Sequence, residues 1–462
     1  MFTTLKNAFK SKEIRTKILI ILGLLVLFRI GCWLPIPGIS VSAFETQVEN
    51  QSFLGLLSGI TGGALANGAM LALGVSPYIT AQIVVQLLSM AIPSWERLAK
   101  QGEEGRKKLA KYTKILTLIL ATAQAIGIVV SFANNGGLDS AVFFNSDFLT
   151  GAVVVLTLVA GAMFTLFLGE KITETGIVNG LSLLIFIGIL STAGMSIPAS
   201  ITNAVNGNLD DLWGILAFVV ALILIFSMIV LMDRAERKVP VQYAKQVRGR
   251  KLYGGQSTFI PIRMMGAGVL PIIFAMSLLS FPQMIFTIFA PNSDAAMWYN
   301  TNLGAGSWAY SIIIGFLILG FAYFTSMMNF KPDDISRQIQ ANGGFIPGIR
   351  PGKTTAEYLN RINKRIVFFG ACFLAFLTIV PTIVFKAIGD TGLVSAFSAT
   401  GMIIVVSCAL EINKGLEQQL LMKNYNFNKA FIINAQRRFL PQFEIVQELP
   451  KCDTRTWNEK ML

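Results

Sequence analysis

The chain has 462 residues, of which 53% are hydrophobic and 14% are charged, and its mean hydropathy is +0.62. A soluble protein of this length is less apolar and more charged, so this composition excludes an ordinary soluble domain and indicates a protein of the lipid bilayer. The formal net charge of +13 would fit a nucleic-acid-binding protein only if the chain held a folded basic module, and the sequence offers none.

Ten apolar stretches are long enough to cross a membrane as helices, because one span needs ~20 mostly apolar residues. They lie at 18–34, 70–92, 113–133, 148–169, 176–198, 211–232, 264–290, 307–330, 364–388 and 392–413. The basic stretch before the first span is similar to the start of a signal peptide. It has no small-residue cleavage site, so we expect a retained first helix.

Lys and Arg residues are concentrated in alternate loops, as the positive-inside rule requires of cytoplasmic segments. The basic group holds 28 of the 38 such residues and comprises the N-terminal arm and loops 93–114, 169–175, 233–263 and 331–365. The other group holds none and comprises loops 35–52, 134–147, 199–210 and 291–306. We therefore expect both termini on the cytoplasmic side.

Residues 53–80, "FLGLLSGITGGALANGAMLALGVSPYIT", are too apolar for a solvated loop. Six glycines between Gly55 and Gly74 also interrupt them too often for one ordinary spanning helix. Irregular backbone at membrane depth is tolerated only where protein buries it or where it lines a water-filled cavity. The segment is therefore expected to fold back into the protein, and the alternative is a plain re-entrant or interfacial loop.

The two long basic loops have Gly/Pro-shaped tips that carry Arg250 and Arg350. Loop 233–263 alternates polar and apolar residues before its "RGRK" tip, which predicts a β-hairpin. The loops are either positive-inside anchors or docking surfaces for an acidic partner or RNA. The stretch "PGIRPGKTT" ends like a phosphate-binding loop but has Pro347 in place of the required glycine, so we expect no nucleotide site.

Catalytic and metal-binding side chains are scarce. The chain has no histidine, and its four cysteines show no CxxC spacing, so neither a metal site, a disulfide scaffold nor an enzyme is expected. A secondary transporter of small solutes remains the alternative function, although midplane polar ligands are few. Arg29, near the outer end of the first span, is interpreted as a snorkelling anchor.

Several stretches, in order along residues 1–426, resemble the SecY family, whose members form the channel of the bacterial protein-secretion translocase. They are "FRIGCWLPIPGI" (28–39), "GGALANGAMLALGVSPYITAQIVVQLL" (62–88), "LGEKITETGIVNGLSLLIF" (168–186), "QSTFIPIRMMGAGVLPIIFA" (256–275) and "GGFIPGIRPGKTTAEYL" (343–359). The resemblance implies a channel that translocates unfolded secretory chains across the membrane and releases hydrophobic segments sideways into lipid.

The implied fold is an all-α polytopic membrane protein of ten transmembrane helices in two inverted five-helix halves around a central pore. The halves are expected at residues 1–200 and 201–426, and the role of residues 427–462, a cytoplasmic extension, is not indicated by the resemblance. An odd number of spans in each half requires the second half to be inverted, which agrees with the alternation of basic loops.

The resemblance also assigns the sealing elements. The plug is expected at about residues 53–69 and includes Phe53, Leu54, Leu57, Gly62, Gly63, Leu65 and Asn67. The pore ring is expected at Val75, Ile79, Leu181, Ile185, Ile273 and Ile404. An apolar, deformable constriction suits this role because hydrophobic side chains cannot replace the hydration shell of an ion.

A lateral gate to lipid is implied between spans two and three on one side and spans seven and eight on the other. Its expected residues are Thr80, Gln86, Gln124 and Phe281. Many family members have an asparagine early in span seven where this chain has Met265, which changes the polar content of the gate. The expected docking residues on the cytoplasmic loops are Arg248, Arg250, Lys251, Arg350 and Lys353.

The partners implied by the resemblance are the SecE and SecG subunits, the SecA ATPase, the ribosome, signal peptides and secretory precursor chains, membrane lipid and a YidC-type insertase. No cofactor is implied. The implied location is the bacterial cytoplasmic membrane.

Overall fold

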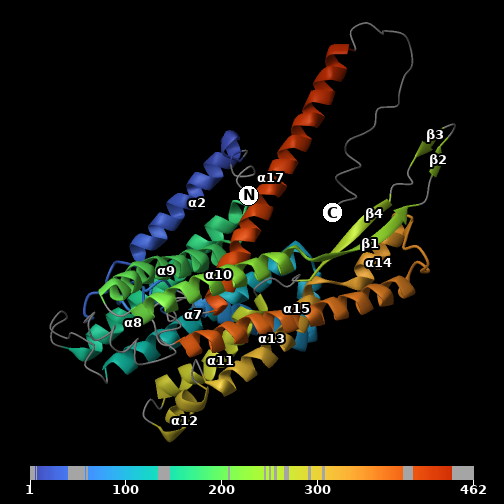
Figure 1. The fold of residues 1–462 in the computed structure, drawn as a ribbon. Helices are drawn as coiled ribbons and strands as arrows, with labels where there is room; N and C mark the ends of the chain where they lie inside the picture. The colour runs from blue at the N-terminus through green and yellow to red at the C-terminus, as the bar shows by residue number, and fades with distance from the viewer. Residues whose placement is uncertain are drawn as a thin grey trace. The chain divides into compact units, whose positions relative to one another are not determined.

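The computed structural model describes residues 6, 8–39, 58, 61–133, 146–206, 209–243, 246–248, 251–253, 257–264, 270–289, 293–303, 307–388 and 399–439. These residues are mostly helical, with a few short strands (Figure 1). The chain divides into two compact units, one made of Met1–Arg15 with Asn413–Leu462 and the other of Thr16–Ile412. Ala8, Ile14 and Leu416 are buried residues of the smaller unit.

A helix lies on each of the ten predicted spans. In chain order these helices are α2 (Lys12–Gly31), α5 (Ser76–Ala91), α7 (Glu103–Ala133), α8 (Asp147–Glu174), α9 (Gly180–Asn206), α10 (Leu209–Arg234), α11 (Leu270–Phe289), α13 (Trp308–Asn329), α15 (Lys353–Ile388) and α17 (Ala399–Phe439). Within the described residues, four helical stretches are long and apolar enough by themselves to cross a bilayer, or five if one bent helix pair counts as a span.

The bent pair is α5 and the short helix α6 (Pro93–Lys100), whose axes differ by 108°. Ile92 lies between them in an extended conformation, with φ −106° and ψ 117°. Pro93 causes this break, because a proline ring disfavours helical backbone at the preceding residue. The break turns the chain sharply before α7 begins at Glu103.

The second span starts later than the sequence predicts. The prediction placed helix from residue 70, whereas residues 70–75 form turns and α5 begins at Ser76. Gly74 has φ +53°, which a right-handed helix does not contain, and Pro77 is favoured in the first turn of a helix. These two residues therefore fix the start of α5.

Two hydrophobic cores hold the helices of the larger unit. One core joins Ile36, Leu65, Ala72 and Leu73 to α7 and α8, where Phe132 and Leu158 are almost fully buried. The other core joins α5, α10, α11, α13, α15 and α17 through residues such as Phe274 and Ile318. Lipid provides no hydrophobic driving force between helices, so close van der Waals packing of such buried side chains is the main favourable term that holds the helices together.

A small module lies beyond the helices and unites the two long basic loops. Strand β1 (Glu236–Tyr243) pairs antiparallel with β4 (Ser257–Arg263), which confirms the predicted hairpin, and β2 (Gln246–Arg248) pairs with β3 (Lys251–Tyr253) near its tip. Strand β5 (Gly344–Phe345), from the other loop, pairs with β1 and gives the sheet order β4-β1-β5. Figure 1 shows the hairpin next to α14 (Pro332–Ala341).

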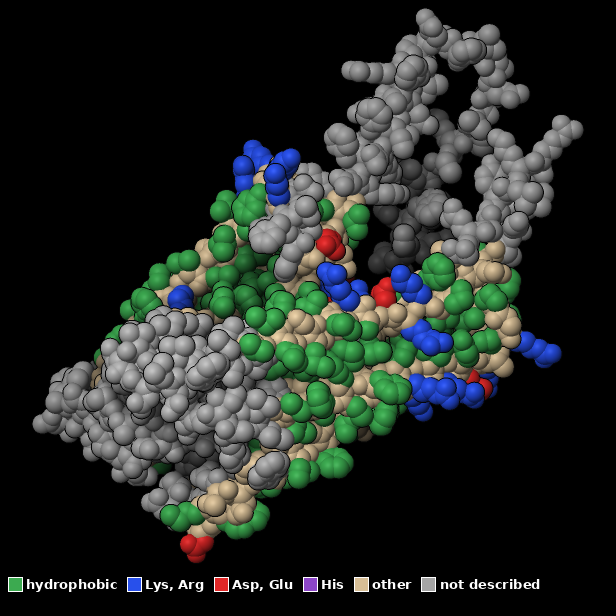
Figure 2. Space-filling model, in the orientation of Figure 1, with side chains coloured by type: hydrophobic (Ala, Val, Ile, Leu, Met, Phe, Trp, Pro, Cys, Tyr) green, Lys and Arg blue, Asp and Glu red, His purple; other side chains and the backbone are tan. Residues whose placement is uncertain are grey.

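The surface of the larger unit has distinct apolar and basic regions. Large apolar side chains are exposed along the spanning helices, for example Leu156, Phe316 and Phe369, which are 64–72% exposed. Figure 2 shows hydrophobic side chains along the helices and Lys and Arg side chains near α14 and the start of α15. Exposed apolar area of this extent is the normal surface of a protein whose solvent is lipid.

Candidate functional site

The described part of the predicted plug is packed against the protein. Phe53, Leu54 and Leu57 lie outside the described residues. Leu65 is fully buried in the core that contains Phe132 of α7 and Leu158 of α8, whereas Asn67 is exposed. Gly62 and Gly63, also named as plug residues, have φ +74° and +82°. Only glycine adopts such angles without strain, so they allow the chain to turn here.

Backbone hydrogen bonds tie the end of this segment to the chain that follows α2. Ile36 N donates to Gly68 O over 2.9 Å, and Met70 N donates to Leu34 O over the same distance. These bonds flank an antiparallel bridge between Pro35 and Ala69. The end of the predicted plug is therefore fixed by a short two-stranded contact.

The six predicted pore-ring residues lie near the start of a helix. Val75 precedes α5 and Ile79 is in its first turn, while Leu181 and Ile185 begin α9, Ile273 begins α11 and Ile404 is in the second turn of α17. Val75, Ile185 and Ile404 are each 4% exposed, and the other three are half-buried. Ile79 packs against the core that contains Ile272 and Ile403. No core cluster of the described chain contains all six.

The helices of the predicted lateral gate are in direct contact. Helix α11 packs against both α5 and α7, and α13 packs against α11. Thr80 Oγ1 donates to Ser76 O within its own helix, 3.2 Å away, so its hydroxyl needs no partner across the seam. In the described structure α11 therefore contacts helices on both sides of the predicted seam.

Gln124 differs from the other gate residues. Its side chain is 7% exposed on α7, and its Oε1 accepts no hydrogen bond from the described residues. A buried amide oxygen without a donor costs about 1–3 kcal/mol. Gln86 is half-buried on α5. Phe281 belongs to α11, and Met265 lies outside the described residues.

The predicted docking residue Arg350 is exposed on a rigid turn. Its carbonyl oxygen accepts hydrogen bonds from Thr354 Oγ1 at 2.6 Å and Thr355 Oγ1 at 2.8 Å. Ser336 Oγ of α14 donates to Gly352 O over 2.7 Å, which fixes the other side of the turn. Lys353 is exposed at the start of α15. The backbone is thus held while the two cationic side chains face solvent.

The other docking residues lie at the hairpin tip. Arg248 and Lys251 are cross-strand partners at the ends of β2 and β3, and Arg250 between them is outside the described residues. Below the tip, the module has its own apolar core. That core includes Val241 of β1, Ile262 of β4, Ile339 of α14 and Leu359 of α15. Both loops are therefore supported by one folded base.

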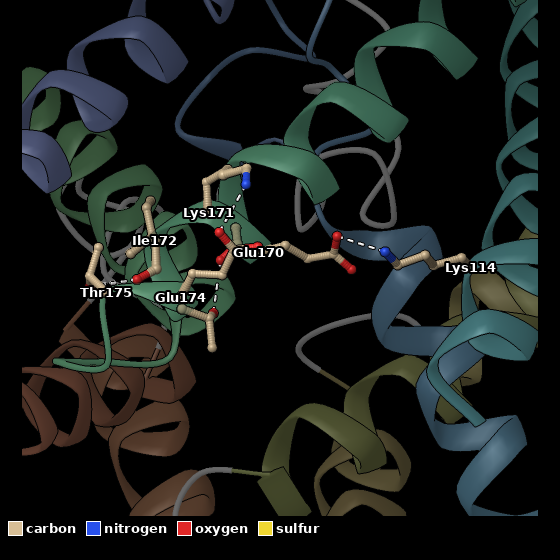
Figure 3. Close-up of polar contacts among 8 residues, drawn as sticks. Lys114, Glu170, Lys171, Ile172, Glu174 and Thr175 are labelled. Atoms are coloured by element: carbon tan, nitrogen blue, oxygen red, sulfur yellow. Dashed lines mark hydrogen bonds and ion pairs between the residues drawn. The ribbon is translucent and has the colours of Figure 1, made fainter. Parts of the chain in front are cut away.

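An ion pair that the sequence did not reveal joins α7 to α8. Lys114 Nζ lies 2.7 Å from Glu170 Oε2, and the two side chains are 44% and 37% exposed (Figure 3). The next residue, Lys171, pairs with Glu174 at 2.9 Å on the same helix. Thr173 Oγ1 accepts from Gly180 N over 2.8 Å and so connects the end of α8 to the start of α9. The motif "LGEKITE" (168–174) contributes at least one residue to each of these three contacts.

A pocket of about 850 Å³ opens between the α6–α7 turn and the ends of α13, α14 and α15. One part of its lining, at the α6–α7 turn, contains Gly102 and Arg106, and a second part, from α13 to α15, contains Tyr323, Lys331 and Lys364. The first part continues into gate helix α7 and the second into gate helix α13. Among the described residues, no three His, Cys, Asp or Glu side chains gather where they could hold a metal ion.

Comparisons with known proteins agree with this geometry. A sequence model of the SecY family matches residues 69–413. The protein translocase subunit SecY of Thermotoga maritima is 39% identical over 453 residues, which cover 95% of this chain and 100% of that protein. The SecY subunit of Streptomyces scabiei is 37% identical over 438 residues, covering 92% of this chain and 99% of that protein.

Solved structures show the same fold. A structure of a protein conducting channel has a TM-score of 0.61 at 18% identity and covers 86% of this chain and 91% of its own. Sec61 in a canine ribosome-channel complex has a TM-score of 0.56 at 17% identity, with the same coverage. The predicted fold class, an all-α polytopic membrane protein of the ten-helix channel type, is confirmed. The match over residues 69–413 and the 39% identity across nearly the whole chain show that this protein belongs to the SecY family.

Proposed function

We propose that the chain is the channel-forming subunit of a bacterial protein translocase, through which unfolded secretory chains cross the cytoplasmic membrane. The observation that carries this proposal is the closed contact of α11 with α5 and α7, beside a buried glycine-rich segment. A channel for whole polypeptides needs a path that is sealed at rest and can open in two directions. A solute transporter would instead need polar ligands at the membrane midplane.

In this account, residues 53–69 form the plug, and the six pore-ring residues form an apolar neck that seals around a moving chain. Residues 1–200 and 201–426 are the two halves that move apart, with the termini and basic loops in the cytoplasm. The alternation of basic loops supports this orientation. Replacing Ile79 and Ile185 together by glycine should raise the resting ion conductance, because the voids admit a file of water.

The lateral gate is proposed to open between α5 and α7 on one side and α11 and α13 on the other. A signal sequence gains ~0.3 to 0.6 kcal/mol for each central Leu, Ile, Phe or Val that enters lipid, and that gain is available only through an open seam. The pocket at the α6–α7 turn has walls on both sides of this seam, so its width would change as the gate opens.

The gate proposal is tested by a disulfide between Thr80→Cys and Phe281→Cys. Crosslinking should proceed in the resting channel and should block secretion and membrane-protein insertion alike. The matched control is each single cysteine variant treated with the same oxidant. Full activity of a fully crosslinked channel would exclude the gate at this seam.

The basic module is proposed to dock the SecA ATPase and the ribosome, because the chain has no expected nucleotide site of its own. The exposed Arg350 and Lys353 on a fixed turn, with Arg248, Arg250 and Lys251 at the hairpin tip, support this role. SecE and SecG subunits and a YidC-type insertase are proposed membrane partners. The chain itself is proposed to carry out no catalysis. Its other ligands are signal peptides, precursor chains and membrane lipid.

A further inference from the structure

The end of α2 contacts the glycine-rich segment through a single charged side chain. Arg29 Nη1 donates a hydrogen bond to the carbonyl oxygen of Gly62 over 3.1 Å, and both residues are at least half-buried. The Arg29 guanidinium also lies 6.0 Å from the ring centre of Trp33. A cation in the last turn of a helix is favoured by the helix dipole. The helix dipole and the Trp33 ring therefore favour the Arg29 cation at this end of α2 in addition to its bond to Gly62.

Gly62 itself fits tightly between α2 and α9. A Cβ atom added to Gly62 would lie 2.6 Å from Arg29 Nη1 and 2.8 Å from the carbonyl oxygen of Gly188 in α9. Its neighbour Gly63 also has positive φ, but an added Cβ there meets no atom within 4 Å. Absence of a side chain at Gly62 thus permits the close approach that the hydrogen bond requires.

The other end of the segment, at Met70 and Leu71, also packs against glycines. The backbone carbonyl of Met70 packs directly on Gly161 of α8, and the Leu71 side chain packs on Gly31 at the end of α2. Between the two ends, Leu65 fills the core shared with α7 and α8. The segment is therefore seated by apolar packing and close backbone contacts, and the Arg29 bond adds a directional, charged contact from α2 at the Gly62 end.

We propose that Arg29 is a positioning residue that latches the plug in its resting place through the carbonyl of Gly62. The inference rests on the proposed plug function of residues 53–69 and names the contact that holds it. A hydrogen bond to a charged donor stabilises more than a neutral one while the site excludes water. In an open, hydrated vestibule, water would satisfy both groups, so the bond can be released at moderate cost.

The test compares resting ion conductance in planar bilayers for the channel complex with its partner subunits, at matched channel abundance. Arg29→Met should raise the population of conducting channels at rest by about tenfold, which corresponds to the loss of about 1.4 kcal/mol of closed-state stabilisation. Arg29→Lys keeps the charge but lacks the longer, planar guanidinium, and should give a smaller rise in resting conductance. Gly23→Ala on α2, where an added Cβ meets nothing, should leave conductance unchanged.

A second pair of variants separates the contact from backbone strain. Gly62→Ala should raise conductance more than Gly63→Ala, because both strain positive-φ positions but only the first collides with Arg29 and Gly188. Equal effects of the two alanines would overturn the latch. This comparison also remains informative if Arg29→Met lowers the yield of folded channel.

Deletion of residues 53–69 distinguishes failure of the latch from failure of the plug. The account predicts that the deletion raises conductance and that Arg29→Met adds nothing in the deleted background, whereas a general structural role would act in both backgrounds. If the deletion raises conductance but Arg29→Met has no effect in the full chain, or acts equally in both backgrounds, the latch is wrong and the plug proposal stands. If the deletion itself leaves conductance unchanged, the plug assignment fails, and the latch fails with it.

Discussion

Tyr243 and Gly344 are antiparallel strand partners although they belong to different inter-helix loops. Gly344 packs so closely on its partner that an added Cβ would lie 2.8 Å from Tyr243 Cε1 and 3.1 Å from Ile339 Cγ2. The pairing makes one module of the two basic loops. The bases of the two basic loops are therefore joined in one sheet.

Gly344→Val should loosen this module without affecting the spans. Overpacking of this kind typically costs about 1–3 kcal/mol, and here it would separate β5 from β1. Limited proteolysis should cut within 233–263 and 331–365 several times faster than in the unmodified channel. Gly320→Ala on α13, where an added Cβ meets nothing, is the matched control. An unchanged cleavage pattern for Gly344→Val would show that the β5 contact does not support the loops.

Two variants at the Arg350 turn distinguish the effect of its charge from the effect of its hydrogen-bonded backbone. Arg350→Glu should abolish most partner-stimulated ATP hydrolysis, because breaking a buried charge contact at an interface typically costs ~2 to 5 kcal/mol. Thr354→Val with Thr355→Val keeps every charge but removes both donors to the Arg350 carbonyl. That variant should lose a smaller part of the ATPase stimulation, measured with purified SecA and reconstituted vesicles.

Gln338→Ala, exposed on α14, is the control for both variants and should behave as the unmodified channel. If the Arg350→Glu channel stimulates ATP hydrolysis by SecA almost normally at matched channel levels, this loop does not dock the ATPase and acts only as a topological anchor.

Gln124→Leu should make the gate harder to open. The substitution removes a buried amide oxygen that has no donor among the described residues, so the closed seam gains up to about 1–3 kcal/mol. Export of a precursor with a weakly hydrophobic signal sequence should slow, whereas a strongly hydrophobic one should be affected less. Gln86→Leu, at a half-buried position, should have the smaller effect. Faster export by Gln124→Leu would mean that the amide stabilises the closed state instead.

The Lys114–Glu170 pair should contribute little to stability despite its short distance. Both side chains are partly exposed, and such pairs are usually worth about 0.2–1 kcal/mol. A double-mutant cycle with Lys114→Met and Glu170→Gln, read from detergent unfolding curves, should give a coupling energy in this range that falls in high salt. A coupling well above 2 kcal/mol would indicate that the pair clamps α7 to α8.

The spans and the hairpin could be predicted because their signals are local. Apolar length placed a helix at each span, and polar-apolar alternation predicted β1 and β4. The start of α5 was misplaced because residues 70–75 are apolar enough for a span, while Gly74 and Pro77 decide the backbone. A hydropathy profile does not detect the backbone conformations that Gly74 and Pro77 impose.

Other features depend on contacts between distant parts of the chain. Strand β5 has only two residues, and its partner β1 lies in another loop, so no local sequence pattern predicts the shared sheet. Arg29 was interpreted as a snorkelling anchor, and only the structure shows its bond to Gly62. The two residues are 33 positions apart, so no local pattern links them. The plug, ring and gate assignments came from the family resemblance, and the docking loops were first indicated by their basic tips; all of these assignments remain predictions.

Protease protection of a secreted precursor shows whether this chain conducts whole unfolded polypeptides. The channel would be purified with its partner subunits, reconstituted in vesicles, and supplied with SecA, ATP and the precursor. We expect full-length precursor to become protease-resistant in an ATP-dependent manner and to be degraded once detergent opens the vesicles. Absence of protected precursor from vesicles that contain folded channel and active ATPase, together with saturable uptake of a small solute, would contradict the account and favour a transporter.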